Sequence, residues 1–202
     1  MLELNCNDVL LDYGGGDGHL IRLASEAKPC SNYFLLEPSD NMREARATLA
    51  GIQNVTFCSN SADLADSMFS KISCLEVFEH VEPASSLDSV IRDIYRCLRP
   101  NGTLVVSMPV EVGPVSLLKN IFRIIAKSTF PGTNLKSMCL SAIGCVSSIP
   151  RTNGHIGFDY RSTLKLLLNA GFEMEQMRFT PIGFGGGVCN SQAHYRFRRP
   201  AR

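Results

Sequence analysis

VLLDYGGGDGHL, residues 9–20, decides the fold, because a short apolar run leads through adjacent glycines into a helical pattern. Val9-Leu10-Leu11 has the composition of a buried strand, and Gly14-Gly15-Gly16 ends it. The helical pattern then covers His19, Leu20, Leu23 and Ala24. Strand, glycine turn and helix in this order open a βα unit.

The alternation of strand and helix continues outward from this unit. We expect further strands at residues 33–36, 55–58, 69–78 and 103–108. A helix is expected from Ser39 or Asp40 to Leu49, and Gly51 ends it. A second helix is expected from Leu87 to Leu98, before a turn at Arg99–Gly102. This alternation predicts a parallel, doubly wound sheet with helices on both faces.

The C-terminal part ends the pattern differently. A helix at residues 162–169 precedes expected strands at 172–180 and 194–197, which are joined by a glycine-rich loop too short for a helix. Two such strands form an antiparallel hairpin. The expected fold class is therefore α/β, with a doubly wound, Rossmann-like and mostly parallel seven-stranded sheet and a C-terminal antiparallel hairpin.

Residues from about 110 to 153 interrupt the alternation of strands and helices, and they predict an insertion or lid within a single domain, 1–202. A helix is expected from Val115 to Ala126, and the following Pro, Gly, Ser and Thr residues predict a mobile stretch. Its apolar residues recur at helical spacing beside basic ones: Leu118, Ile121, Phe122 and Ile125 with Lys119, Arg123 and Lys127. Such a helix packs on the core as a lid, lies on a membrane surface, or covers a lipid-like acceptor.

Charge and cysteine content narrow the function classes. With 20 Lys and Arg against 19 Asp and Glu, the net charge of +1 gives no overall field for DNA or RNA, so we expect no nucleic-acid partner. The eight cysteines include no Cys-x-x-Cys pair, and Cys58 and Cys74 lie in expected strands, which favours a reducing cytoplasm. No signal peptide and no apolar run of about 18 residues is present, so we expect neither secretion nor a membrane span.

The glycine loop predicts a nucleoside site. In open parallel sheets, ligands bind at the carboxyl ends of the strands where the strand order reverses, and the loop from Asp12 to Gly18 follows the first strand. Its glycines allow positive φ and close backbone approach to a ligand. Glu37 ends the second strand, where a carboxylate can accept hydrogen bonds from a ribose diol. A dinucleotide fingerprint beginning at Gly14 needs a glycine at position 19, where His19 stands, so nicotinamide binding is disfavoured.

Five segments together resemble the class I S-adenosylmethionine (SAM)-dependent methyltransferases, in particular the small-molecule branch with type 11 and type 12 domains. They are VLLDYGGGDG (9–18), LLEPSDNM (35–42), SKISCLEVFEHV (70–81), LRPNGTLVVSMP (98–109) and GHIGFDYRSTLKLLLNAGFE (154–173). They resemble, in order, the first motif, the acidic second-strand motif, the fourth motif, the turn and fifth strand, and the late helix and strand.

The resemblance implies SAM as the cofactor and assigns it the residues Asp12, Gly14, Gly16, Gly18, Glu37, Met42 and Asn60. Met42 packs against the adenosine or is an ordinary core residue, and Asn60 accepts from the adenine amino group or is an ordinary loop residue. Asp12 contacts the cofactor or caps local backbone amides. Ser70 and Gly15 depart from the family, which has Asp and Cys or Ala there.

Members of this family commonly cover the cofactor with an N-terminal helical region. This sequence begins a few residues before its first expected strand. We therefore expect a more exposed cofactor, or a cover supplied by a partner or by the 110–153 insertion.

Candidate catalytic residues follow the fourth strand and precede the late helix. Methyl transfer from a sulfonium needs positioning, exclusion of water and sometimes a base, and His80 or His155 can accept a proton near neutral pH, with Glu79 beside His80. Alternatively, Glu76, Glu79, His80 and His155 bind a divalent metal, as in some metal-dependent O-methyltransferases of this fold, or the Glu-His-Val segment only shapes the substrate cavity. His19 and His194 are interpreted as surface or packing residues.

These observations favour a SAM-dependent methyltransferase that acts on an O or N atom of a small or lipid-like acceptor. A non-catalytic methyltransferase-like domain that binds a nucleoside or a partner is the alternative. An NAD-dependent oxidoreductase is a weaker alternative, because the third fingerprint glycine is missing.

Overall fold

The computed structural model describes residues 1–27, 30, 32–81, 86–125, 134–146, 149 and 157–201. These residues form one seven-stranded sheet in the order β3-β2-β1-β4-β5-β7-β6. The strands are β1 Val9–Tyr13, β2 Asn32–Leu36, β3 Val55–Cys58, β4 Phe69–Leu75, β5 Leu98–Pro109, β6 Glu173–Thr180 and β7 Gln192–Arg198. The helices are α1 His19–Ala27, α2 Met42–Thr48, α3 Leu87–Cys97, α4 Pro114–Ile125, α5 Leu135–Ala142 and α6 Tyr160–Asn169, with 3-10 turns η1 Ser61–Asp63, η2 Phe78–His80 and η5 Gly186–Val188.

The sheet confirms the predicted fold class. Strands β3, β2, β1, β4 and β5 pair in parallel, whereas β7 pairs antiparallel with both β5 and β6. The chain order reverses between β1 and β4, so the loops after these two strands meet at the carboxyl edge of the sheet.

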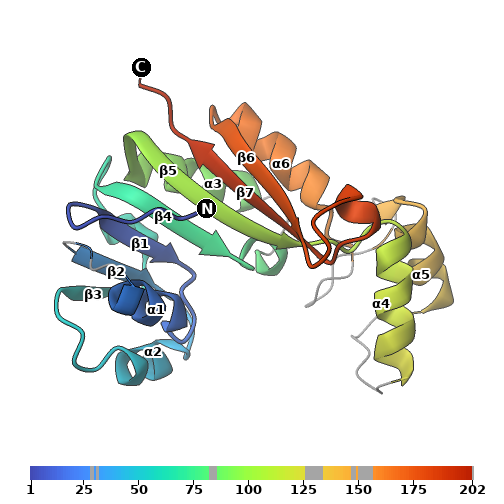
Figure 1. Cartoon of the computed structure of the whole chain (residues 1–202), viewed down its shortest axis with the longest axis horizontal. Coiled ribbons are helices and arrows are strands. Elements are labelled where there is room, and N and C mark those ends of the chain that lie inside the picture. Colours follow the sequence, from blue (N-terminus) through green and yellow to red (C-terminus); the bar gives the residue numbers. More distant parts are fainter. Residues whose placement is uncertain are drawn as a thin grey trace.

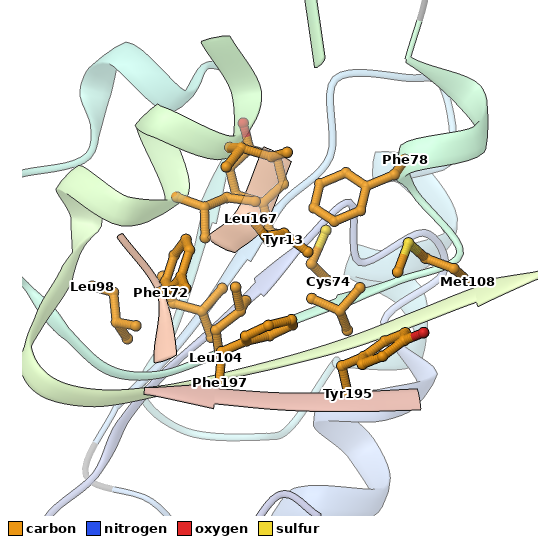
Figure 2. Packing of buried hydrophobic residues seen from close by; sticks show 14 of the residues in the cluster. Tyr13, Cys74, Phe78, Leu98, Leu104, Met108, Leu167, Phe172, Tyr195 and Phe197 are labelled. Carbon is orange, nitrogen blue, oxygen red and sulfur yellow. The ribbon is translucent and has the colours of Figure 1, made fainter. Parts of the chain in front are cut away.

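Helices cover the two faces of the sheet in separate groups (Figure 1). On one face, α1 and α2 bury Ile21, Ala24 and Ala45 against Leu10 and Leu35, and Leu49, which follows α2, joins them. On the other face, α3 and α6 cover the larger core. Helix α3 repeats its buried residues, Leu87, Ile91 and Ile94, at helical spacing. Figure 2 shows the facing side chains of the sheet, including Leu104, Tyr195 and Phe197.

Strand β4 is shorter than expected. We predicted a strand to Phe78, but it ends at Leu75, because Glu76 has a φ of 54° and takes the chain out of the extended conformation. The turn expected at Arg99–Gly102 is instead part of β5, whose pairing with β4 shifts register between Phe69 and Lys71.

The insertion contains a second helix, α5, in the stretch where only a mobile segment was expected. Its start is a capping box: Ser137 N–H donates to Asn134 Oδ1 (2.8 Å), and Asn134 N–H donates to Ser137 Oγ (3.0 Å). From composition alone, Asn and Ser residues indicate a loop. In the structure, Asn134 and Ser137 instead form hydrogen bonds with backbone amides at the N-terminus of a helix.

Candidate cofactor site and active site

A cavity of about 340 Å³ lies at the carboxyl edge of the sheet and is lined by the loops that follow β1, β2, β3 and β4. Its lining residues are Tyr13, Gly14, Leu36, Pro38, Ser59, Asn60, Ser61, Val77, His80, Val81 and Val90. The volume suits a small-molecule ligand. The lining brings together three residues that the sequence singles out, Gly14, Asn60 and His80, from loops far apart in the chain.

The glycine loop joins the ends of β1 and β2. The N–H groups of Gly14 and Gly15 donate to the Leu36 carbonyl at 2.8 and 3.1 Å. Gly14 has a φ of 73°, and a Cβ atom there would lie 2.6 Å from Val77 Cγ2. At Gly16, φ is 54° and no described atom lies within 4 Å of the Cβ position. The loop therefore packs tightly at Gly14 and leaves open space at Gly16.

Glu37 is 7% exposed and holds the glycine loop from the end of β2. Its Oε2 accepts from Gly16 N–H (2.9 Å), and its Oε1 accepts from Ser39 N–H (3.0 Å). Each carboxylate oxygen has a second lone pair for a further donor. The carboxylate thus fits the predicted ribose contact while also shaping the loop.

Asp12 adopts an arrangement that the sequence does not reveal. Its buried carboxylate accepts from Ser73 Oγ on β4 at 2.7 Å. Burial raises the pKa of Asp12 from 3.8 to about 6, and the Ser73 hydrogen bond opposes this rise. A Cβ atom at Gly15 would lie 2.9 Å from Asp12 Oδ2, so the buried carboxylate occupies the space that a side chain at position 15 needs.

The remaining cofactor candidates lie in different surroundings. A Cβ at Gly18 would lie 2.9 Å from Leu49 Cδ1, so this glycine allows the start of α1 to pack against the residue that follows α2. Met42 packs partly buried against the apolar cluster beneath α1 and α2. Asn60 lines the cavity, and its Oδ1 accepts from Ala62 N–H at 3.0 Å. Their contacts with the cofactor stay predictions.

The residues after β4 separate into different environments. His80 is exposed and lines the cavity, whereas Glu79 is 2% exposed and is not among the lining residues described. Glu76 Oε1 accepts from Ser107 Oγ at 2.8 Å. His155 lies outside the described residues. Within those residues, no group of three His, Cys, Asp or Glu side chains could bind one metal ion, and the predicted four-residue metal site stays untested.

Strand pairing brings Ser107 and His194 together near this edge. Ser107 is buried on β5 and pairs with His194 on β7, which was interpreted as a surface or packing residue. His194 Nε2 lies 2.9 Å from Thr180 Oγ1, and partial burial lowers its pKa, while the Glu76 charge acts in the opposite direction. Only the register between β5 and β7 places them together, and no local motif signals it.

The described part of the chain contains no helix long and apolar enough to cross a membrane.

Comparisons with known proteins agree with this architecture. A family profile described as a methyltransferase domain matches residues 2–177. No curated protein matches the chain.

Solved structures share the fold at low identity. A putative SAM-dependent methyltransferase from Listeria monocytogenes is 14% identical, with a TM-score of 0.66 over 98% of this chain and 94% of the other. A putative methyltransferase from Bacillus halodurans is 16% identical, with a TM-score of 0.64 over 98% of this chain and 95% of the other. The N-methyltransferase NodS from Bradyrhizobium japonicum, solved with S-adenosyl-L-homocysteine, is 12% identical, with a TM-score of 0.60 over 96% and 79% of the two chains.

Proposed function

Because this chain belongs to the class I SAM-dependent methyltransferases, we propose that it transfers a methyl group to an oxygen or nitrogen atom of a small or lipid-like acceptor. The observation that carries the proposal is the cavity at the carboxyl edge, which joins the glycine loop, the end of β2, the loop after β3 and His80 in one space.

The glycine loop and Glu37 fit SAM. Gly16 offers open space beside its backbone, and the Glu37 carboxylate lies next to it with lone pairs for the ribose hydroxyls. Asn60 lines the same cavity and is proposed to accept from the adenine amino group. When bound, the cofactor supplies a methyl group on a sulfonium sulfur, already activated for in-line displacement.

The acceptor needs orientation and, where it is a hydroxyl or a protonated amine, a base. His80 is the proposed base, because its side chain lines the cavity and a neutral imidazole nitrogen can accept a proton from the acceptor. Glu79, which precedes His80 in the chain, is buried. We propose that it supports the local structure and does not contact the acceptor. His155 is the second proposed base.

Eight free cysteines support a cytoplasmic location.

Calorimetry with SAM and S-adenosylhomocysteine tests the cofactor site. We expect Glu37→Gln to weaken binding by about 1.5–3 kcal/mol, or more than tenfold, the scale of a charge-assisted hydrogen bond. Glu44→Gln is the matched control, because it removes the same charge from an exposed position on α2. If the two variants bind SAM with equal affinity, the ribose of the cofactor does not bind at Glu37.

A methyl-transfer assay with radiolabelled SAM tests the chemistry against hydroxyl- and amine-bearing amphiphiles. For such an acceptor, we expect His80→Ala to lower kcat at least about a hundredfold, as for loss of a general base. His19→Ala changes an exposed histidine on α1 and leaves kcat unchanged. An unchanged kcat in His80→Ala would transfer the base role to His155.

A further inference from the structure

Helix α4 has its polar side toward the protein and its apolar side toward solvent. Ser116 is 0% and Asn120 is 4% exposed, and Lys119 and Arg123 complete a polar stripe at spacings of three and four residues. The opposite side is exposed and apolar, with Leu117, Leu118, Ile121, Phe122, Ile124 and Ile125. A surface helix of a water-soluble domain normally has the reverse orientation. In the described residues, this apolar side does not pack on the core, and a membrane surface or a lipid-like acceptor stays a prediction for it.

A buried carboxylate fixes this orientation. Glu111 follows β5 and is 3% exposed. Its Oε1 lies 2.5 Å from Lys119 Nζ and 3.1 Å from an Arg123 terminal nitrogen, and Arg123 also donates to Asn120 Oδ1 at 3.1 Å. A buried charge needs its partners, so Glu111 holds the polar stripe inward. The apolar side consequently remains outward.

The exposed apolar surface extends beyond α4. It continues onto Leu135 and Ile143 at the two ends of α5 and onto Ile182, Phe184 and Val188 around η5, and both α5 and η5 contact α4. We call these residues and the apolar side of α4 the apolar end. In the described residues, it holds eleven of the fifteen exposed large hydrophobic side chains. Figure 1 shows α4 and α5 beyond the end of the sheet toward which β1 and β4 point, which is also the edge with the cavity. A surface so rich in apolar side chains indicates a binding partner.

The charge distribution indicates what that partner is. Residues 111–158 contain five basic side chains, Lys119, Arg123, Lys127, Lys136 and Arg151, against one acidic side chain, Glu111. The rest of the chain contains 15 basic and 18 acidic residues. The positive charge of the molecule is thus concentrated in the segment that carries the apolar helices. A twofold dimer through this surface would oppose two copies of the same positive segment, which is unfavourable. An anionic, apolar partner matches both properties.

We propose that the apolar end docks in the interfacial region of an anionic lipid bilayer. Helix α4 has 12 residues, too few to span the hydrocarbon core, so it lies along the surface with its apolar side in the acyl boundary. Among the described cations of the segment, Lys119 and Arg123 pair with Glu111, while Lys136 on α5 is exposed and available to an anionic headgroup. Docking also brings the carboxyl edge of the sheet toward the bilayer, and the link to a lipid-like acceptor, but not the docking itself, rests on the proposed function.

Co-sedimentation of the full chain with vesicles tests the proposal without any methyl-transfer assay. We expect binding to phosphatidylcholine vesicles that contain phosphatidylglycerol, weaker binding to phosphatidylcholine alone, and loss of the difference at high salt. The double variant Phe122→Ser, Ile125→Ser is expected to bind at least about tenfold more weakly, because it removes two exposed apolar side chains from the docking side. Lys136→Gln lowers the affinity for the anionic vesicles by about fivefold.

The matched control removes exposed apolar side chains elsewhere. Leu23→Ser, Met177→Ser changes α1 and β6 and retains wild-type vesicle binding. Unchanged calorimetric SAM affinity in the α4 variant shows that its fold is intact, so failure of docking and failure of the cofactor site are separate results. No binding to anionic vesicles, or equal binding by both double variants, overturns the proposal. Self-association seen by light scattering and abolished by Phe122→Ser, Ile125→Ser would assign the surface to a second copy of the chain instead.

Discussion

Gly14→Ala tests whether the glycine loop is shaped by contact with Val77. The added Cβ has two costs: a φ of 73°, which disfavours a side chain by about 1–2 kcal/mol, and a contact of 2.6 Å with Val77 Cγ2. Ordinary carbon contacts lie at about 3.5–4 Å, so the overlap is about 1 Å and adds about 1–3 kcal/mol of overpacking. The lower entropy of alanine in the unfolded chain returns about 0.4–1 kcal/mol. We expect a net loss of about 1–4.5 kcal/mol, centred on about 3 kcal/mol.

Gly16→Ala is the matched comparison, because its φ of 54° imposes similar backbone strain while no described atom lies near the Cβ position. Its expected loss is about 1 kcal/mol. The contact with Val77 also predicts a rescue: Gly14→Ala should cost less in a Val77→Ala background than in the native chain, by about 1–3 kcal/mol.

Urea unfolding of the four variants, followed by circular dichroism, measures these differences, and calorimetry with SAM measures the site in parallel. Equal losses for Gly14→Ala and Gly16→Ala would refute the argument from contact. A loss at Gly14 that Val77→Ala does not reduce would do the same.

Three further predictions concern buried charge and metal. The pKa of Asp12 is about 6 in the folded chain and 3.8 for the free side chain. Below both values the carboxyl is protonated in both states, so its ionisation does not change the free energy of unfolding. Between them only the folded chain holds the proton, so the free energy of unfolding falls as the pH rises. The free energy of unfolding of Asp12→Asn, relative to that of the native chain, should therefore increase between about pH 4 and 6, by at most on the order of 3 kcal/mol at pH 7. A difference in unfolding free energy that does not depend on pH would contradict this explanation. Glu111→Gln should cost about 2–4 kcal/mol in urea unfolding, because it leaves Lys119 and Arg123 half-buried without their anion, whereas Asp88→Asn, which breaks an exposed pair with Arg92, should cost about 0.5 kcal/mol or less. EDTA is expected to leave methyl transfer unchanged, because Glu79 is buried while His80 lines the cavity, and transfer that is lost and then restored by Mg²⁺, Mn²⁺ or Zn²⁺ would revive the metal site with His155.

Local patterns were sufficient for the architecture. The apolar run before Gly14, the alternation of strands and helices, and the short connection between β6 and β7 predict the seven-stranded sheet and its antiparallel end. Each of these signals depends on residues near one another in the chain, and the rules for parallel crossovers and hairpins then leave few topologies. The position of Gly14 and Glu37 at the carboxyl edge follows from the same local signals.

The details of the site depend on contacts between distant residues. Asp12 meets Ser73, and Ser107 pairs with His194, only because neighbouring strands adopt one register, which no short window of sequence contains. The end of β4 at Leu75 depends on the positive φ of Glu76, whose N–H donates to the Ser107 carbonyl and whose Oε1 accepts from Ser107 Oγ on β5. The orientation of α4 was decided in the same way. Its sequence predicts an amphipathic helix with a basic side and an apolar side, but not which side faces the protein. Glu111 decides this in the folded chain, because a buried carboxylate requires the cations to turn inward.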